Sequence, residues 1–279
     1  MAREVAIVTG GTRGIGSGIA EHLARAGYDL ILGYSSNSTA AKKTQEALQN
    51  SHGVKVATVC GDVAEQTTID NMFNCLTTEF AGQKLKAMVH NAGLYVGKTT
   101  PPASNKAINA AAAGNPLSGD GSFDNFDQYD YYQNVYPKCF IRLVEGAASH
   151  MTEGGHIVAT SSPGCNTNQT PKLRYMLPGQ AKAGLEYLVR HYALMLAPKN
   201  ITVNVIIPGF TRTEAWQPLL STMGGIDGEV SKGMLKQRCP MNRWGSVGEM
   251  GGVVAFLCSP AACYITGVAI PIDGGLHLM

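Results

Sequence analysis

The run Thr9-Gly-Gly-Thr-Arg-Gly-Ile-Gly16 carries three glycines at a spacing that suits the binding of a phosphate group. Gly10, Gly14 and Gly16 lack side chains, so the chain can turn tightly there and its backbone can approach a pyrophosphate closely. Helical periodicity starts at Gly14, and the first turn of a helix offers unpaired N–H groups and a favourable dipole to an anion. Because any turn between a strand and a helix can use glycine, the run predicts a dinucleotide site only together with its surroundings.

Tyr175 and Lys182 are residues that could move a proton, and they are seven positions apart. A free phenol has a pKa of about 10, and a nearby ammonium group stabilises its ionised form and so favours proton transfer. Pro178, which has no side-chain proton to give, stands four residues before Lys182. Since proline suits the first turn of a helix, we expect Pro178 to lie in that turn and Tyr175 on the loop before it.

Three interpretations of Tyr175 follow. In the first, the loop folds its hydroxyl back into the site, where Tyr175 donates a proton. In the second, Tyr175 lines the pocket and the proton comes from elsewhere, and in the third it is a surface aromatic residue. The difference matters because a ketone needs a donor for the developing alkoxide, whereas an iminium ion already carries the positive charge that a hydride neutralises.

Strand-like and helix-like segments alternate along the chain, and these elements must position the residues named above. Short apolar runs predict strands at 4–9, 28–33, 54–60, 85–90, 155–161, 201–207 and 268–272, and longer runs predict helices at 14–26, 40–50, 65–81, 124–151, 181–197 and 247–259. The alternation predicts an α/β fold, a single-domain Rossmann-like, doubly wound and mostly parallel sheet with helices on both faces. Right-handed crossovers would bring the carboxyl ends of the strands together as a ligand crevice.

Two segments depart from this alternation within the single domain expected over residues 1–279. Segment 98–122 is rich in Ala, Asn, Gly and Pro, and it is longer than most loops between a strand and a helix. Segment 208–243 carries few periodic signals. We interpret both as candidate lids or inserts, with surface decoration as the alternative.

Composition limits the class of protein and its partners. A chain of 279 residues can bury a large core, and its formal net charge of +2 argues against nucleic acid or an anionic membrane as the main partner. Seven cysteines without a Cys-x-x-Cys pair favour a reducing compartment. No apolar run approaches the roughly 18 residues of a membrane-spanning helix, so we expect a cytoplasmic protein. His90, His150 and His156 show no ligand spacing, and no metal site is predicted.

Together with the glycine run, six further motifs resemble those of the short-chain dehydrogenase/reductase family over nearly the whole chain. The glycine run has the family's form Thr-Gly-x-x-x-Gly-x-Gly. The other motifs are Asp62-Val63, Asn91-Ala92-Gly93, Asn134-Val135, Ser161-Ser162, Pro208-Gly209 with Thr211 and Thr213, and Asp273-Gly-Gly275. The family usually places a tyrosine one helical turn before a lysine. Here Pro178 occupies that position, while Tyr175 keeps a family-like spacing of thirteen after Ser162.

The resemblance implies a role for each matching residue. Ser162 would orient the substrate, Asn134 would hold a water on the proton path, and Lys182 would bind the nicotinamide ribose and tune the proton donor. Tyr175 is that donor only under the first interpretation above, and Asp62 would contact adenine. The implied cofactor-binding residues are Gly10, Thr12, Arg13, Gly14, Ile15, Gly16, Tyr34, Ser35, Ser36, Asn37, Asp62, Val63, Asn91, Ala92, Gly93, Lys182, Pro208, Gly209, Thr211 and Thr213.

The end of the second predicted strand favours NADP(H) over NAD(H). A carboxylate there would bind the ribose 2′-hydroxyl of NAD, and the run from Gly33 to Asn37 contains none. Arg13 could instead face a 2′-phosphate, which a guanidinium group binds well, and Ser35, Ser36 and Asn37 could donate hydrogen bonds to it. In the alternative interpretation, Arg13 is a solvated loop residue.

We therefore expect an NADPH-dependent oxidoreductase that reduces a small or medium organic carbonyl or imine/iminium compound by hydride transfer. The Pro178-Gly179 pair before Lys182 resembles the Pro-Gly loops of atypical fungal members of the family. Some of these members reduce cyclic iminium compounds, and some guide cycloadditions. The alternatives are a non-redox cyclase or isomerase of natural-product biosynthesis, with NADP(H) as scaffold, and a regulatory binder of NADP(H). The family commonly forms homodimers or homotetramers through two long helices, here 124–151 and 181–197.

Overall fold

The computed structural model describes residues 3–93, 127–166, 169–172, 175–221 and 224–279. Its centre is a seven-stranded sheet in the order β3-β2-β1-β4-β5-β6-β7, in which every neighbouring pair is parallel. The strands are β1 (Val5–Thr9), β2 (Asp29–Tyr34), β3 (Val56–Cys60), β4 (Leu85–His90), β5 (Gly155–Thr160), β6 (Ile201–Pro208) and β7 (Ala269–Ile272). The predicted Rossmann-like fold and all seven predicted strands are confirmed, with ends that differ by no more than two residues.

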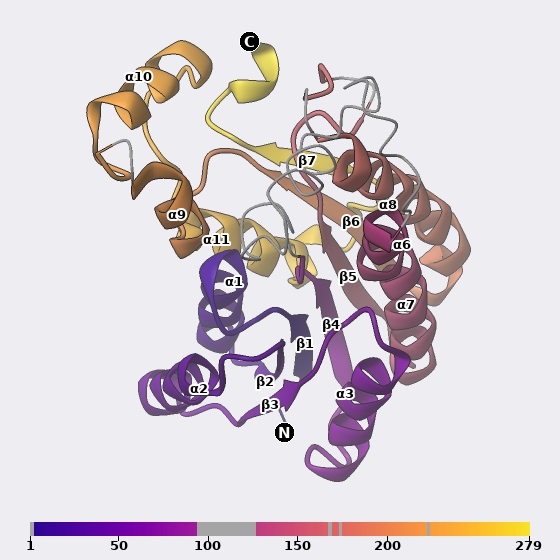
Figure 1. Ribbon diagram of the computed structural model, residues 1–279. Coiled ribbons are helices and arrows are strands. Elements are labelled where there is room, and N and C mark those ends of the chain that lie inside the picture. The colour runs from indigo at the N-terminus through magenta and orange to yellow at the C-terminus, as the bar shows by residue number, and fades with distance from the viewer. Residues whose placement is uncertain (1–2, 94–126, 167–168, 173–174, 222–223) are drawn as a thin grey trace.

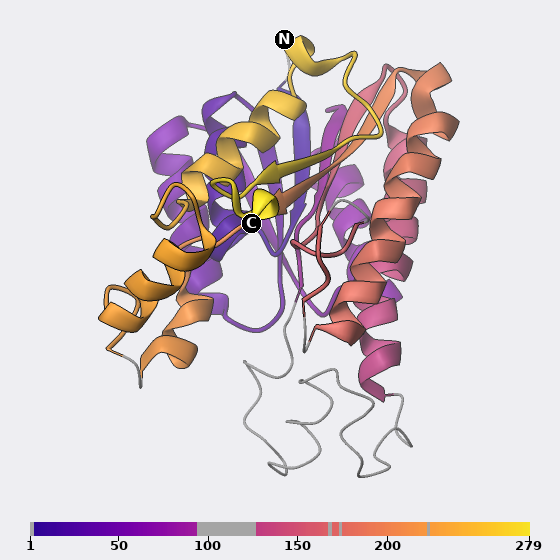
Figure 2. The ribbon, with the colours of Figure 1, turned by 90° about the horizontal axis from the view of Figure 1, so that it is seen from above.

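Helices cover both faces of the sheet, as Figure 1 shows and as Figure 2 shows from above. One face carries α1 (Gly14–Arg25), α2 (Ser38–His52) and α11 (Val247–Leu257), and the other carries α3 (Gln66–Thr78), α7 (Cys139–His150) and α8 (Met176–Leu196). Side chains of a strand point alternately to the two faces. Each face of the sheet therefore builds its own hydrophobic core.

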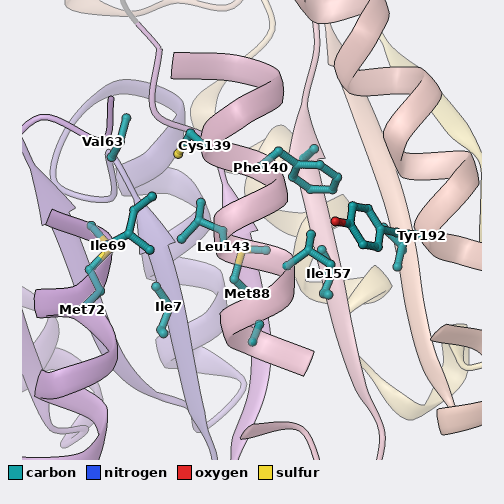
Figure 3. Close-up of a cluster of buried hydrophobic side chains, with 14 of the residues drawn as sticks. Ile7, Val63, Ile69, Met72, Met88, Cys139, Phe140, Leu143, Ile157 and Tyr192 are labelled. Carbon is teal, nitrogen blue, oxygen red and sulfur yellow. The ribbon is translucent and has the colours of Figure 1, made fainter. Parts of the chain in front are cut away.

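The larger core lies between the sheet and the helices α3, α7 and α8 (Figure 3). Ile7, Met88 and Ile157 point into it from three neighbouring strands, and each is fully buried. Leu143 and Phe140 of α7 close over them. This packing fixes α7 and α8 against the sheet, and so fixes the positions of the polar residues at the ends of these helices.

The helix predicted at 124–151 is interrupted, which corrects the expectation of one continuous element. Residues 124–126 lie outside the described residues, and the remainder divides into α6 (Asp127–Gln133), a π-helical turn η1 (Asn134–Lys138) and α7. Pro137 explains the interruption, because it has no N–H to donate to Gln133 and its ring crowds the preceding turn. Wider i→i+5 pairing follows, with the Cys139 N–H donating to the Asn134 carbonyl.

Helix α8 begins at Met176, five residues before the predicted start at 181. Tyr175 is its N-cap residue, and its carbonyl accepts a hydrogen bond from the Gly179 N–H at 2.8 Å. Pro178 is the third residue of the helix, where a missing N–H costs nothing because the first-turn donors have no intrahelical partner. The expected placement of Pro178 in the first turn and of Tyr175 just before it is confirmed.

Segment 208–243 is more regular than its sequence indicated. It contains the short helices η3 (Glu214–Trp216) and α9 (Gln217–Leu220) and the helix α10 (Glu229–Arg238). Phe210 packs edge-on against Trp216 and Trp244 beside α10. Trp216 is therefore engaged in packing, and the segment shares a small core with Trp244 and Leu276, which lie outside it. The predicted insert at 98–122 lies outside the described residues.

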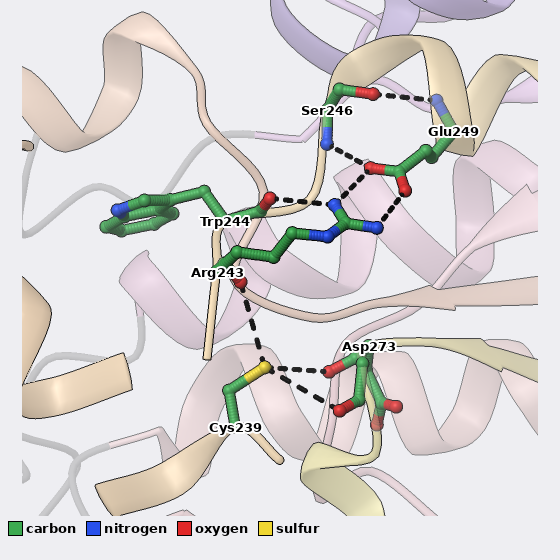
Figure 4. Close-up of polar contacts among 7 residues, drawn as sticks. Cys239, Arg243, Trp244, Ser246, Glu249 and Asp273 are labelled. Carbon is green, nitrogen blue, oxygen red and sulfur yellow. Dashed lines mark hydrogen bonds and ion pairs between the residues drawn. The ribbon is translucent and has the colours of Figure 1, made fainter. Parts of the chain in front are cut away.

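The end of this segment is tied to the body of the protein by polar contacts (Figure 4). Arg243 donates two hydrogen bonds to Glu249, at 2.6 and 3.0 Å, and Glu249 forms a capping box with Ser246 at the start of α11. Cys239 Sγ lies 3.7 Å from the carbonyl oxygens of Arg243 and Asp273. The segment is therefore anchored at 239–249 against α11 and the loop after β7.

Candidate active site

The predicted site residues gather at one edge of the sheet, because the carboxyl ends of parallel strands meet there. Those that lie within two residues of a strand's end are Gly10 after β1, Ser35 after β2, Asp62 after β3, Asn91 after β4, Ser162 after β5 and Gly209 after β6. Lys182 reaches the same edge from α8, since its amino group contacts the last carbonyl of β5. The structure thus brings together residues that are up to about 200 positions apart in the sequence.

The glycine loop has the backbone geometry that its sequence predicted. Gly10 and Gly14 have φ angles of 62° and 55°, in the left-handed region that favours glycine. A Cβ atom at Gly16 would lie 2.0 Å from the Gly10 carbonyl oxygen, so the loop closes against the first turn of α1 only without a side chain. The N-cap residue Arg13 makes no side-chain hydrogen bond to that turn. The backbone N–H groups of the first turn of α1 are therefore suited to hold an anion such as a pyrophosphate.

A cavity of about 360 Å³ separates the start of α1 from the loop that follows β6. Gly14 and Ser17 line one side, and Arg212, Thr213 and Glu214 line the other. A Cβ atom at Gly14 would lie 3.7 Å from the Thr213 side chain. The loop after β6 therefore faces the glycine loop, which is the arrangement that a ligand contacting both would require.

Asn91 links the glycine loop to the middle of the sheet. Its side-chain amide group donates to the carbonyl oxygens of Thr9 and Gly10, each at 3.3 Å, and its side-chain oxygen accepts from Thr160 Oγ1 at 3.5 Å. Lys182 Nζ in turn donates to the Thr160 carbonyl at 3.0 Å. A continuous series of hydrogen bonds therefore runs from the glycine loop through Asn91 to Lys182.

The end of β2 carries no carboxylate, and its exposed side chains include Ser35 and Ser36. The side-chain oxygen of Asn37 accepts from the Ala40 N–H at 2.9 Å and caps α2, which leaves its amide group as the donor. Arg13 lies 3.8 Å from Glu214, and both side chains are more than half exposed. Such surface ion pairs contribute little, so Arg13 can exchange this partner for a more highly charged anion.

At the end of β3, Asp62 is already engaged by the protein. Its Oδ1 accepts from the Ala64 N–H at 2.9 Å, and its Oδ2 lies 3.5 Å from the hydroxyl of Tyr131. Val63 is buried beside it. These contacts fix the Asp62 side chain at the strand end, where the family motif predicts contact with adenine.

Lys182 is a buried lysine at the centre of the site. Its amino group donates to the carbonyls of Thr160 and Ser161, at 3.0 and 3.4 Å, and lies 4.5 Å from the ring centre of Tyr136. Burial lowers the pKa of Lys182 to about 8. The lysine is therefore still mostly protonated at neutral pH, and a modest change in its surroundings would alter its charge.

Tyr136 is a further residue of the site, and none of the sequence motifs includes it. It is the third residue of the π-helical turn and is buried, and its hydroxyl lies beside Gly93 of the Asn-Ala-Gly motif, where a Cβ atom would approach it to 2.8 Å. The pKa of Tyr136 is raised well above its usual value, first by burial and next by the neighbouring phenol of Tyr175. The phenol of Tyr136 therefore lies beside Lys182 and interacts electrostatically with the phenol of Tyr175.

Ser162 and Asn134 complete the set of predicted catalytic residues. Ser162 is the second residue after β5 and is partly exposed, whereas Ser161, which directly follows the strand, is buried and donates a hydrogen bond from its hydroxyl to Glu186. Asn134 is partly buried and opens the π-helical turn. A turn of this kind disturbs regular backbone pairing, which makes Asn134 the point at which the long helix changes its geometry beside the site.

Comparison with protein families gives one match that covers most of the chain. A family model described as "Enoyl-(Acyl carrier protein) reductase" matches residues 10–107 and 104–277. The two matched stretches meet inside the segment 98–122, which the sequence marks as a candidate insert. The match includes the glycine loop, Asn134, Ser162 and Lys182.

Curated relatives align over nearly their whole length. The 3-oxoacyl-[acyl-carrier-protein] reductase FabG of Aquifex aeolicus is 30% identical over 277 residues, which are 98% of this chain and 97% of that protein. The hydroxynaphthalene reductase-like protein Arp2 of Metarhizium anisopliae is 28% identical over 281 residues, which cover 99% of this chain and 95% of that protein. Both have names that describe reductases or reductase-like proteins.

Solved structures agree with the fold. The L-sorbose reductase of Gluconobacter frateurii, solved with NADPH and L-sorbose, has a TM-score of 0.81 at 24% identity, covering 100% of this chain and 98% of that one. A short-chain dehydrogenase/reductase from Serratia marcescens has a TM-score of 0.78 at 28% identity, with 99% of both chains covered. The chain belongs to the short-chain dehydrogenase/reductase family of nicotinamide-dependent oxidoreductases.

Proposed function

We propose that the protein is an NADPH-dependent reductase that transfers a hydride to a small or medium organic carbonyl or imine/iminium compound. The observation that carries this proposal is the series of hydrogen bonds from Gly10 through Asn91 and Thr160 to Lys182. These hydrogen bonds connect the glycine loop, which is suited to bind a pyrophosphate, to Lys182, which is suited to bind the nicotinamide ribose. The relatives support the proposal, since FabG and the L-sorbose reductase carry the names of carbonyl reductases.

The residues present fit a bound dinucleotide. The glycine loop and the uncapped start of α1 would hold the pyrophosphate, Asp62 would contact adenine, and Lys182 would bind the nicotinamide ribose. When bound, NADPH supplies the hydride. Ser162, at the end of β5, would then hold the substrate beside the nicotinamide and exclude water from the reacting face.

Delivery of the proton distinguishes the two substrate classes. For a carbonyl substrate, Tyr175 is the proposed donor, and Lys182 and a water held near Asn134 would replace its proton. The buried Pro178 one helical turn before Lys182 provides no such group. An iminium substrate needs no donor, so the same site could reduce it without help from Tyr175.

Replacement of Tyr175 by phenylalanine should separate these possibilities, and Tyr136→Phe is its matched comparison because the two phenols are neighbours. If Tyr175 donates the proton, its removal should lower kcat for a ketone by about 100-fold or more and leave kcat for an iminium compound within about twofold. Steady-state rates with both substrate classes provide the measurement. A ketone rate that is unchanged in Tyr175→Phe but reduced in Tyr136→Phe would transfer the role of donor to Tyr136.

Selectivity for NADPH should depend on Arg13. Loss of the guanidinium group in Arg13→Ala removes a charged partner of the 2′-phosphate but no contact of NADH, so the dissociation constant of NADPH should rise about tenfold, which corresponds to about 1.4 kcal/mol. Fluorescence titration with both cofactors provides the measurement. Arg25→Ala, in the last turn of α1 and well exposed to solvent, is the control. Tighter binding of NADH than of NADPH by the unaltered protein would contradict the proposed cofactor.

The function itself is tested by incubating the protein with NADPH and panels of carbonyl and cyclic iminium compounds while NADPH absorbance and product are followed. Consumption of NADPH with a reduced product supports the reductase.

The proline in place of the usual tyrosine favours one second candidate, a cyclase or isomerase of natural-product synthesis that uses NADP(H) as scaffold. Conversion of substrate without consumption of NADPH would support that candidate, and binding without either outcome would support a regulatory binder.

We further propose that the protein is a homodimer or homotetramer. Tyr187, Leu194 and Met195 lie on an exposed side of α8, with exposed fractions of 62%, 80% and 54%. An apolar side of this kind on one of the two long helices is suited to packing against a second subunit.

In the part of the chain that the structure describes, no helix is long and apolar enough to span a membrane.

A further inference from the structure

Glu186 is a buried acidic residue one helical turn after Lys182 on α8, and no sequence motif gave it a role. Residues four apart in a helix lie on the same side of it. The exposed fraction of Glu186 is 2%, and that of Lys182 is 8%. Acidic and basic side chains are almost never buried so completely unless they are paired or otherwise compensated.

The contacts of Glu186 direct it to the same strand end that Lys182 binds. Its Oε1 accepts a hydrogen bond from the hydroxyl of Ser161, while Lys182 donates to the carbonyl of that serine. The second oxygen, Oε2, is buried without a hydrogen-bond partner among residues 3–93, 127–166, 169–172, 175–221 and 224–279. An unpaired buried oxygen is costly, which favours a role beyond the contact with Ser161.

We propose that Glu186 is a positioning residue: its carboxylate supplies the negative charge that keeps Lys182 protonated and held at the end of β5. Lys182 acts on the cofactor, and Glu186 acts through Lys182 and Ser161. The inference rests on the proposed function only in using NADPH as the ligand that reports the charge of Lys182.

The other charged and titratable groups around Lys182 do not replace this carboxylate. Burial lowers the pKa of Lys182, Cys165 and Glu186 raise it, and Lys172 lowers it. The pKa of Cys165 is itself raised, chiefly by burial, so this thiol is mainly neutral. His90 of β4 is neutral too, since burial and then Lys182 lower its pKa to about 3.

The phenol of Tyr136 beside the lysine is neutral as well. Tyr136 presents its ring to Lys182 from the π-helical turn, and its pKa is raised well above the usual value by burial and then by Tyr175. Among these groups within the described part of the chain, Glu186 is thus the one carboxyl group that acts on Lys182, and it raises the pKa of the lysine.

The test compares NADPH binding across pH in the wild type and in Glu186→Gln, which keeps an oxygen for the Ser161 hydroxyl but removes the charge. The dissociation constant is measured by fluorescence from about pH 6 to about pH 10, a range that spans the titration of a lysine with a lowered pKa. The wild type should lose affinity as the pH rises through about 8, where Lys182 loses its proton. In Glu186→Gln this loss should move to lower pH by about one unit, because an opposite charge favours the protonated lysine.

Two further variants distinguish charge from packing. Glu186→Asp keeps the charge and should show nearly the wild-type pH profile. Asp29→Asn removes another buried carboxyl group, which accepts hydrogen bonds from Lys55 and Gln83 at the amino-terminal end of β2, and it should leave the profile unchanged. A profile that is the same in Glu186→Gln and the wild type, or a wild type whose affinity does not fall above neutral pH, would overturn the proposal.

If Glu186→Gln does not fold alone, the stability of the double variant Lys182→Met/Glu186→Gln gives the answer. The single variant leaves a buried lysine whose charge is uncompensated, and the double variant removes that charge. The double variant should therefore fold and melt several degrees higher than Glu186→Gln. A double variant as unstable as the single one would overturn the proposal. The pH profile of NADPH binding can be measured without turnover. If Glu186→Gln shifts this profile but the protein reduces no compound, the proposed reductase function is refuted and the role of Glu186 stands. Absence of any NADPH binding would refute both.

Discussion

Lys182→Met should lower the rate of NADPH-dependent reduction by about 1,000-fold, within the range that positioned groups contribute to proton transfer. The physical reason is that one amino group has two tasks. It is proposed to hold the nicotinamide ribose, and it places a positive charge beside the phenol ring of Tyr136 at the end of β5. Methionine fills most of the same volume but provides neither the charge nor a donor. The measurement is kcat/KM with NADPH and the best carbonyl substrate found.

The matched control for this variant is Lys84→Met. Lys84 precedes β4 at the opposite edge of the sheet, where it is more than half exposed and pairs with Glu153. It should change the rate by less than about twofold, as surface substitutions usually change stability little. A Lys182→Met protein that is folded and retains more than about a tenth of the wild-type rate would contradict the proposed site.

Gly16→Ala should weaken NADPH binding by about 100-fold, which corresponds to about 2.7 kcal/mol. The added Cβ would lie 2.0 Å from the Gly10 carbonyl oxygen and 2.7 Å from the side-chain nitrogen of Asn91. Because the closest atom is backbone, the glycine loop must open, and its N–H groups then no longer converge on a phosphate. Fluorescence titration with NADPH gives the dissociation constant, and circular dichroism shows whether the fold is retained.

Gly233→Ala is the control for this second prediction. Gly233 lies within α10, and a Cβ atom there would meet nothing within 4 Å. Alanine favours a helix by up to about 1 kcal/mol over glycine, so this variant should bind NADPH normally and be no less stable than the wild type. Equal affinities for NADPH in Gly16→Ala and Gly233→Ala would refute the assignment of the glycine loop.

Most of the fold could be predicted because the sheet is parallel and buried on both faces. Such strands read as short apolar runs, as in Leu85–His90 and Ile201–Pro208, and their places in the sequence were clear. Helix boundaries were harder to place. Helix α8 begins at Met176 because its first turn tolerates Pro178, and the short stretch Met-Leu-Pro-Gly-Gln before Ala181 gave no periodic signal of this.

The cofactor loop was predictable for a related reason, since glycines at fixed spacing leave little choice of geometry. The surroundings of Lys182 were not, because they depend on contacts between distant elements. Tyr136 reaches the lysine only because the helix widens to a π-turn at Pro137, and a proline inside a predicted helix was the signal that could have indicated this. Glu186 could have been noticed as an acidic residue four positions after Lys182 on an otherwise apolar side of the helix.

The spacing of Tyr175 and Lys182 has a geometric consequence for the molecules that the site can accept. Seven residues of α-helix advance about 10.5 Å and return to within about 20° of the starting direction, whereas four residues advance about 6 Å. With Tyr175 at the N-cap of α8, the span along the helix axis between the phenol-bearing residue and the lysine is about one turn longer than a four-residue spacing gives. If Tyr175 is the donor, the substrate atom that accepts its proton would therefore lie nearer the start of α8 and farther from the ribose that Lys182 is proposed to bind.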